Sequence, residues 1–91
     1  MQKIRKDKRL GENIRAMRTN LHLTQDDVVA KLQVAGSTLS RSAYSQIECG
    51  TYNLRVSELA VLRQIFGVDY NAFFEGIDIP DIIDAAESTD P

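Results

Sequence analysis

The stretch that decides the fold covers residues 23–50 and reads LTQDDVVAKLQVAGSTLSRSAYSQIECG. Its apolar residues recur at helical spacing in two separate segments, so we expect one helix at about 24–32 and a second at about 40–49. The first segment is rich in Val and Leu and suits packing, whereas the second has one small polar face. We therefore expect the first helix to support the second.

Both expected helices begin at a residue that can cap them. The hydroxyl of Thr24 can accept a hydrogen bond from the free N–H groups of the first turn, and Asp27 occupies the reciprocal position of a capping box. Leu23 and Val28 have the spacing of a hydrophobic staple. The second helix repeats the arrangement with Ser40 as its cap.

The second helix separates its residues into two faces. Ala43, Tyr44 and Ile47 share the face that we expect to be buried. The opposite face holds Arg41, Ser42, Ser45, Gln46 and Cys49. It has no acidic residue, and its side chains are of the types that bind base edges and phosphates in the major groove of DNA. An ordinary solvated polar face remains the alternative at this point.

Two longer segments carry a resemblance to a known family. LGENIRAMRTNLHLTQDDVVAKLQV (residues 10–34) and SRSAYSQIECGTYNLRVSELAVLRQIFGVDYNAFFEG (residues 40–76) resemble the phage-repressor and Cro-like helix-turn-helix family, also called the XRE type. The matching pieces, in order, are Ile14-Arg15-x-x-Arg18, Leu23-Thr24-Gln25, Ile47-Glu48-x-Gly50 and Gly67-Val68. Together they cover about three quarters of the chain.

The resemblance implies an all-α, lambda-repressor-like fold, a compact bundle of five short helices. Sparse Gly and Pro and the lack of strand-type alternation also favour an all-α fold. We expect further helices at about 9–21, at about 56–66 and from Asp69 onward. The expected buried residues of the first of these are Leu10, Ile14, Met17 and Leu21, and those of the later ones are Val56, Leu59, Leu62, Phe66, Phe73 and Phe74.

The resemblance also implies roles for individual residues. Arg18 should form a partly buried ion pair with Glu48, and Gln25 should contact a phosphate and brace the second helix. The expected base-reading residues are Arg41, Ser42 and Gln46, with Ser45 and Cys49 secondary. The residues expected at phosphates or in bracing contacts are Gln25, Ser40, Arg18, Thr51, Tyr52 and Asn53.

The turn between the two helices departs from the family pattern. Residues 33–39 (QVAGSTL) make a longer connection than the usual three- or four-residue turn. We expect Val34 to fill part of the core and Leu39 to return the chain to it. His22 stands where the family prefers Gly, so we expect a left-handed backbone there.

Length and composition fit one small domain. The chain has 91 residues, 43% of them hydrophobic, and no apolar run long enough for a membrane span. Its charged N-terminus does not have the pattern of a signal peptide, and we expect a cytoplasmic protein. One His and one Cys are too few for a catalytic or metal-binding constellation, so we expect no enzyme activity and no cofactor.

The net charge of −2 hides an uneven distribution. Residues 1–74 hold all 11 Lys and Arg residues and seven of the 13 acidic ones, whereas residues 75–91 hold six acidic residues and no basic one. Residues 1–8 are a basic N-terminal arm that either touches phosphate or only aids solubility. Residues 77–91 are acidic and contain four isoleucines, so they are either a dimer or partner contact or a frayed tail.

These observations favour a sequence-specific regulator that binds double-stranded DNA. We expect a dimeric repressor of phage or mobile-element type, with residues 9–76 as its DNA-binding domain and residues 40–49 as its recognition helix. Arg41 would prefer guanine and Gln46 adenine. The alternative is an antitoxin-like or partner-docking module, in which the helix-turn-helix is a scaffold and residues 77–91 bind another protein.

Overall fold

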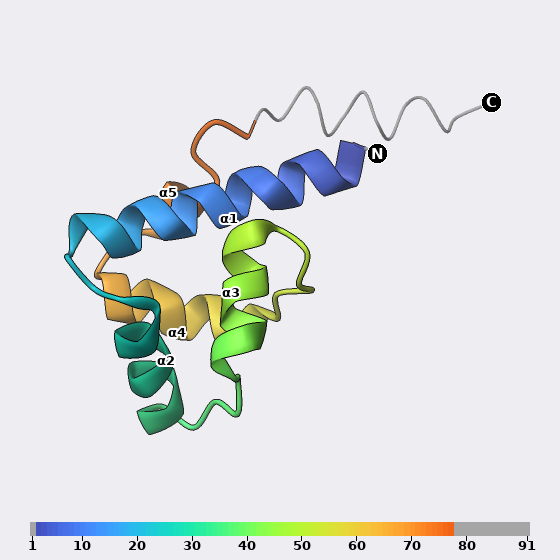
Figure 1. The fold of residues 1–91 in the computed structure, drawn as a ribbon. Helices are drawn as coiled ribbons and strands as arrows, with labels where there is room; N and C mark the ends of the chain where they lie inside the picture. Colours follow the sequence, from blue (N-terminus) through green and yellow to red (C-terminus); the bar gives the residue numbers. More distant parts are fainter. Residues whose placement is uncertain (1, 78–91) are drawn as a thin grey trace.

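The computed structural model describes residues 2–77, which form five helices and no strand. The helices are α1 (Gln2–Asn20), α2 (Gln25–Val34), α3 (Arg41–Cys49), α4 (Val56–Phe66) and α5 (Tyr70–Phe73). In Figure 1, α1 lies across one side of the molecule, and α2, α3 and α4 lie together beneath it. The expected all-α fold is confirmed, and residues 78–91, including most of the acidic segment, lie outside the described range.

Helix α1 begins at Gln2, about seven residues earlier than expected. The segment that we assigned to a separate basic arm is therefore helical from residue 2 onward. Lys and Arg are good helix formers, and no Pro or Gly precedes Gly11, so the charged run has nothing to stop the helix.

The end of α1 corrects one prediction and confirms another. His22 has a φ of 59°, so it does adopt the left-handed conformation expected of it. Its N–H donates to the carbonyl of Thr19, and the N–H of Leu23 donates to the carbonyl of Arg18. The prediction that Leu21 is buried was wrong: it is 47% exposed, because it lies in this turn and not on the helix.

The capping box of α2 is complete. Thr24 Oγ1 accepts a hydrogen bond from the Asp27 N–H at 3.0 Å, and Asp27 Oδ2 accepts one from the Thr24 N–H at 2.9 Å. The backbone hydrogen bond from Thr24 lowers the pKa of Asp27. At its other end α2 continues to Val34, which is 90% exposed. Val34 therefore does not fill the core as predicted, because the longer helix turns it toward solvent.

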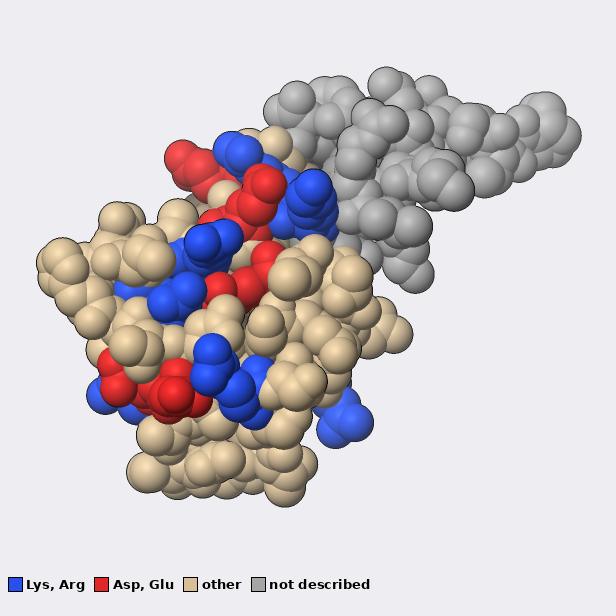
Figure 2. All heavy atoms as spheres, viewed as in Figure 1, with Lys and Arg blue, Asp and Glu red and all other residues tan. Residues whose placement is uncertain are grey.

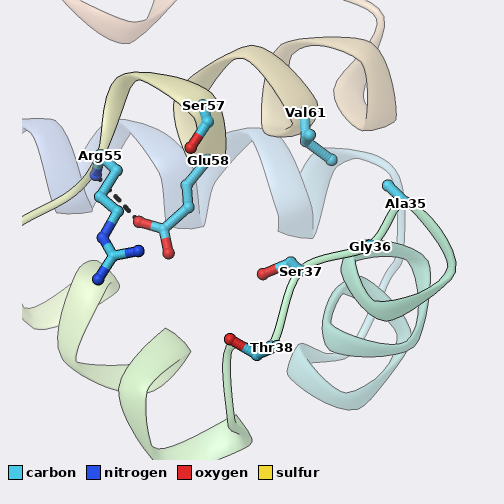
Figure 3. Close-up of a pocket in the computed structure, with 8 residues that line it drawn as sticks. All are labelled: Ala35, Gly36, Ser37, Thr38, Arg55, Ser57, Glu58 and Val61. Carbon is cyan, nitrogen blue, oxygen red and sulfur yellow. Dashed lines mark hydrogen bonds between the residues drawn. The ribbon is translucent and has the colours of Figure 1, made fainter.

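The connection from α2 to α3 is enlarged, as the sequence indicated, and covers residues 35–40. Leu39 returns to the core with 5% exposure, and Ser37 Oγ supports this turn by accepting a hydrogen bond from the Leu39 N–H at 3.1 Å. The turn lies over the start of α4 and leaves a cavity of about 210 Å³ between them. Figure 3 shows that Ser37 and Thr38 line it from the turn, opposite residues of α4.

The core takes residues from all five helices and from the turn before α3. It consists of Ile14, Val28, Val29, Leu32, Leu39, Tyr44, Ile47, Leu62, Phe66 and Phe73. Besides Leu21 and Val34, two more residues predicted to be inside are exposed: Val56 is 83% exposed and Phe74 is 48% exposed. Val56 is the first residue of α4 and faces solvent, and Phe74 follows the four-residue α5, which turns only Phe73 inward.

Helices α1 and α3 meet closely at Gly11. A Cβ atom at this position would lie 2.5 Å from the carbonyl oxygens of both Ile47 and Glu48, which is inside van der Waals contact. The other side of α1 holds the end of α5, since Asn13 Nδ2 donates to the carbonyls of Phe73 and Glu75, each at 2.8 Å. Helix α1 therefore fixes both the end of α3 and the end of the described chain.

Candidate nucleic-acid interface

Helix α3 is fixed at both ends. Ser40 is its N-cap, and its Oγ accepts a hydrogen bond from the Ala43 N–H at 3.1 Å. Gly50 ends the helix in the left-handed conformation, with a φ of 80°. Tyr44 and Ile47 are both buried in the core, and only one rotation of the helix about its own axis buries both of them. The opposite face must then point outward.

The outward face contains the residues that the sequence predicted. Arg41, Ser42, Gln46 and Cys49 are exposed, and Ser45 is partly buried. They come from successive turns of one helix, so they form a single ridge along α3. The ridge offers one guanidinium, one amide, two hydroxyls and one thiol, which together can donate and accept hydrogen bonds.

Arg18 and Glu48 form an ion pair behind this ridge. Arg18 Nε lies 2.7 Å from Glu48 Oε2 and Nη2 lies 3.1 Å from Oε1, with side chains that are only 12% and 4% exposed. Arg18 Nη1 also donates to the carbonyl of Leu23 at 2.8 Å. Arg18 is therefore placed to brace α3 against α1 and the turn before α2, and it is largely withdrawn from the surface where a phosphate would lie.

The pair shifts the pKa values of both partners. The hydrogen bond to Glu48 raises the pKa of Arg18 above its ordinary value. Burial raises the pKa of Glu48, but the hydrogen bonds from Arg18 and Gln25 and the charge of Arg18 outweigh this effect, so the pKa of Glu48 lies below its ordinary value. Both groups are therefore charged at neutral pH.

Gln25 connects this buried pair to the ridge. Its Nε2 donates to Glu48 Oε1 at 3.0 Å, and its Oε1 accepts a hydrogen bond from Arg41 Nε at 2.9 Å. The amide thus links the first turn of α2 to both ends of α3. This geometry supports the bracing role expected of Gln25, while a side-chain contact with phosphate would compete with these two bonds.

Arg41 has a second partner that the sequence reasoning did not find. Its Nη1 lies 3.1 Å from Asp26 Oδ1, and both side chains are more than half exposed. Asp26 lies in the first turn of α2, where an acidic side chain also suits the positive end of the helix dipole. Its position one residue after Gln25, which was already expected to touch α3, was the available signal.

The three residues predicted to bind phosphate in the loop after α3 differ in their exposure. Thr51 and Asn53 are exposed, and the Thr51 N–H donates to the carbonyl of Gln46 at 3.0 Å. Tyr52 is partly buried against the core, and its hydroxyl donates toward Glu58 at 3.4 Å. Tyr52 is therefore turned toward α4, whereas Thr51 and Asn53 remain open to a ligand.

Glu58 is a buried carboxylate that the sequence analysis missed. Its Oε1 accepts a hydrogen bond from the Arg55 N–H at 2.9 Å, which is the glutamate half of a capping box for α4. The signal in the sequence was the spacing: Glu58 comes three residues after Arg55, the residue that precedes α4. Because Arg55 has no acceptor to complete the box, the site stabilises the helix start and needs no functional explanation.

Tyr44 has a buried hydroxyl with no hydrogen-bond partner among the described residues. Burial, together with the nearby Glu48 carboxylate, raises the pKa of Tyr44, so the phenol is neutral. The ring fills the centre of the core under the ridge, and its aromatic area fixes the position of α3.

The molecular surface shows no single large basic patch on the face that Figure 2 displays. Blue Lys and Arg atoms lie next to red Asp and Glu atoms there.

Within residues 2–77, no group of three or more His, Cys, Asp or Glu residues is arranged to hold a metal ion. None of the helices in the described part is long and apolar enough to cross a membrane.

One comparison with known proteins agrees with this geometry. Residues 11–79 match the sequence model of a family described as a helix-turn-helix domain, which is well over half of the chain. No curated protein and no solved structure matches the chain significantly. The family match covers α2, the enlarged turn and α3, the elements that form the ridge and its support.

Proposed function

This chain belongs to the helix-turn-helix domain family, and from that membership we propose that it is a sequence-specific regulator of transcription that binds double-stranded DNA. In such domains the second helix of the motif lies in the major groove, and its exposed side chains read base edges. The resemblance to phage repressors and Cro narrows the proposal to a repressor of phage or mobile-element type, of the XRE class.

The observation that carries the proposal is the ridge on α3 together with its bracing. Arg41, Ser42 and Gln46 are exposed on a helix whose opposite side is buried, and the Arg18–Glu48 pair fixes that helix from behind. A helix that is held rigidly loses little conformational entropy when it docks. This combination favours direct reading of bases over a merely solvated surface.

Each exposed residue takes a role in the proposal. Arg41 prefers guanine, Gln46 prefers adenine, and Ser42 adds a hydrogen bond to either. Ser45 and Cys49 lie further along the same face and make secondary contacts. The groups proposed to contact or position phosphates are Ser40, Thr51 and Asn53, with Gln25 and Arg18 in bracing roles and Tyr52 more distant.

A homodimer fits the proposal, because two copies would read two half-sites about one helical turn apart. Two exposed aromatic side chains support the dimer: Tyr70, which begins α5, is 47% exposed, and Phe74, which follows α5, is 48% exposed. Arg63 lies 5.1 Å from the centre of the Tyr70 ring. Large exposed aromatic side chains are enriched at protein interfaces.

Selection of duplexes from a random pool, followed by affinity measurements, tests the function. We expect one enriched motif, and we expect Arg41→Ala to weaken binding to it about tenfold or more while relaxing the preference at one base pair. Arg15→Ala removes an equal charge from an exposed position on α1 and is the matched control. If no motif is enriched and wild type binds all duplexes equally weakly, the proposal is wrong.

The rival function is a protein-interaction module of the antitoxin or partner-docking kind. The exposed aromatic pair on and after α5 also favours it, and its other support, the acidic segment 77–91, lies almost entirely outside the described residues. Deletion of residues 78–91 separates the two functions. DNA binding that falls with salt and survives the deletion supports the regulator, whereas salt-insensitive binding to a protein that the deletion abolishes supports the module.

A further inference from the structure

The contact between Asp26 and Arg41 lies at the proposed DNA-reading surface. Asp26 Oδ1 is 3.1 Å from Arg41 Nη1, and the two side chains are 74% and 57% exposed. Gln25 at the same time accepts a hydrogen bond from Arg41 Nε at 2.9 Å. Two of the three guanidinium nitrogens are thus already hydrogen-bonded within the chain.

These contacts bear directly on how Arg41 would meet a base. An arginine reads guanine through two parallel N–H donors, supplied either by Nε and Nη2 or by Nη1 and Nη2. Nε has a single N–H, and Gln25 accepts it, so the first pair is occupied. Nη1 has two N–H groups, and Asp26 accepts one of them. Guanine must therefore either displace Gln25 or share Nη1 with Asp26, and the Asp26 carboxylate adds repulsion toward the acceptor atoms of the base and toward phosphate.

Arg41 is also the only positive charge that α3 carries. Between Lys31 and Arg55 the sequence contains no other Lys or Arg. An ion pair with Asp26 therefore neutralises the single cation of the reading helix. Since phosphate attraction supplies most of the sequence-independent affinity for DNA, this neutralisation lowers the affinity of the ridge for any duplex.

We propose that Asp26 masks Arg41 in the DNA-free protein and so lowers the affinity of the helix-turn-helix for DNA, an inference that rests on the DNA-binding function proposed above. Exposed ion pairs are weak, so a duplex can displace the carboxylate, and the mask reduces binding without blocking it. The charge of Asp26 is not required for capping, because Thr24 and Asp27 form the capping box of α2 by themselves.

The substitution Asp26→Asn tests the mask, because it keeps the shape of the side chain and removes its charge. On the duplex selected by wild type, we expect binding about two- to fivefold tighter at low salt, with the difference shrinking as salt rises. Asp69→Asn is the matched control: it removes an equal charge at the start of α5, where the side chain makes no capping bond. We expect it to change affinity less than Asp26→Asn does.

A second arm places Asp26→Asn in an Arg41→Gln background. A mask acts only through the arginine, so the gain in affinity should disappear there, as in a double-mutant cycle. A gain of the same size in that background would show general repulsion between Asp26 and DNA and overturn the mask. Unchanged binding of Asp26→Asn would also overturn it, and weaker binding would show that the carboxylate itself contacts a base.

The wild-type measurement keeps this inference separate from the function on which it rests. If wild type selects no duplex, the DNA-binding function fails, and the mask fails with it. If wild type selects a duplex and Asp26→Asn binds it no better, only the mask fails. Thermal unfolding of each variant, compared with wild type, verifies that the affinities refer to folded protein.

Discussion

Glu48, near the end of α3, accepts two hydrogen bonds from the guanidinium of Arg18 in α1, at 2.7 and 3.1 Å. The carboxylate is almost fully buried, and Gln25 of α2 donates a third hydrogen bond to it at 3.0 Å. One acidic side chain therefore joins the first three helices. The stability of the fold and the position of the proposed reading helix both depend on this contact.

The first prediction concerns the loss of one partner of this pair. Arg18→Ala leaves the buried Glu48 carboxylate without its countercharge, so we expect the free energy of unfolding to fall by about 3 kcal/mol or more. Urea denaturation measures the change. Arg15→Ala, at an exposed position of the same helix, should change stability by less than about 0.5 kcal/mol. Equal effects of the two substitutions would contradict the bracing role of Arg18.

The second prediction is a pH dependence caused by the same carboxyl group. The folded-state pKa of Glu48 lies below its ordinary value of 4.5. A depressed pKa means that the unfolded chain binds the proton more readily, so this contribution to stability is present above pH 4.5 and is lost as the pH falls through the folded-state pKa. Asp27 shifts in the same direction.

We therefore expect the melting temperature of wild type to fall when the pH drops below about 4.5. Glu48→Gln lacks the titrating group. We expect its melting temperature to be lower than that of wild type at neutral pH and to change less with pH over this range. Calorimetry from neutral to acidic pH compares the two proteins. Parallel curves would mean that other carboxyl groups cause the acid sensitivity.

The third prediction concerns the close approach of α1 and α3. Gly11→Ala places a methyl group 2.5 Å from two backbone carbonyl oxygens of α3, and backbone cannot move aside as a side chain can. We expect a loss of about 1–3 kcal/mol of stability and weaker DNA binding, because α3 must shift. Glu12→Ala, at the exposed neighbouring position, is the control and should be close to neutral.

The fourth prediction separates the two apolar residues that flank the enlarged turn. Leu39 is 5% exposed and Val34 is 90% exposed. Leu39→Ala should cost about 2–3 kcal/mol of stability through lost burial and the cavity it leaves, whereas Val34→Ala should be close to neutral. Denaturant midpoints of both variants give the comparison. A large effect at Val34 would indicate a partner that covers it in solution.

The fifth prediction concerns the second proposed base reader. Gln46→Ala should weaken binding to the selected duplex by about 1–3 kcal/mol and relax the preference at one base pair, since Gln pairs with adenine through two hydrogen bonds. The side chain of Gln46 is exposed, so the free energy of unfolding should be nearly unchanged. An equal loss of affinity for every sequence would assign Gln46 to the DNA backbone instead.

The sequence by itself determined the helices of the motif and the way that they begin. Thr24, Asp27 and Ser40 act through atoms only a few residues away along the chain, so their caps follow from local spacing. The burial of Tyr44 and Ile47 follows from helical period, which in turn exposes Arg41 and Gln46. The Arg18–Glu48 pair was accessible only through the resemblance to a family, because the partners are far apart in sequence.

Only the tertiary structure decided which outward residues meet one another. The exposure of Val34, Val56 and Phe74 was mispredicted because each lies at or just beyond a helix end, where the helical period does not fix direction. The need for Gly at position 11 comes from the carbonyls of a helix more than thirty residues away. The contact between Asp26 and Arg41 depends on how α2 and α3 cross, and the residues of the enlarged turn do not specify that angle.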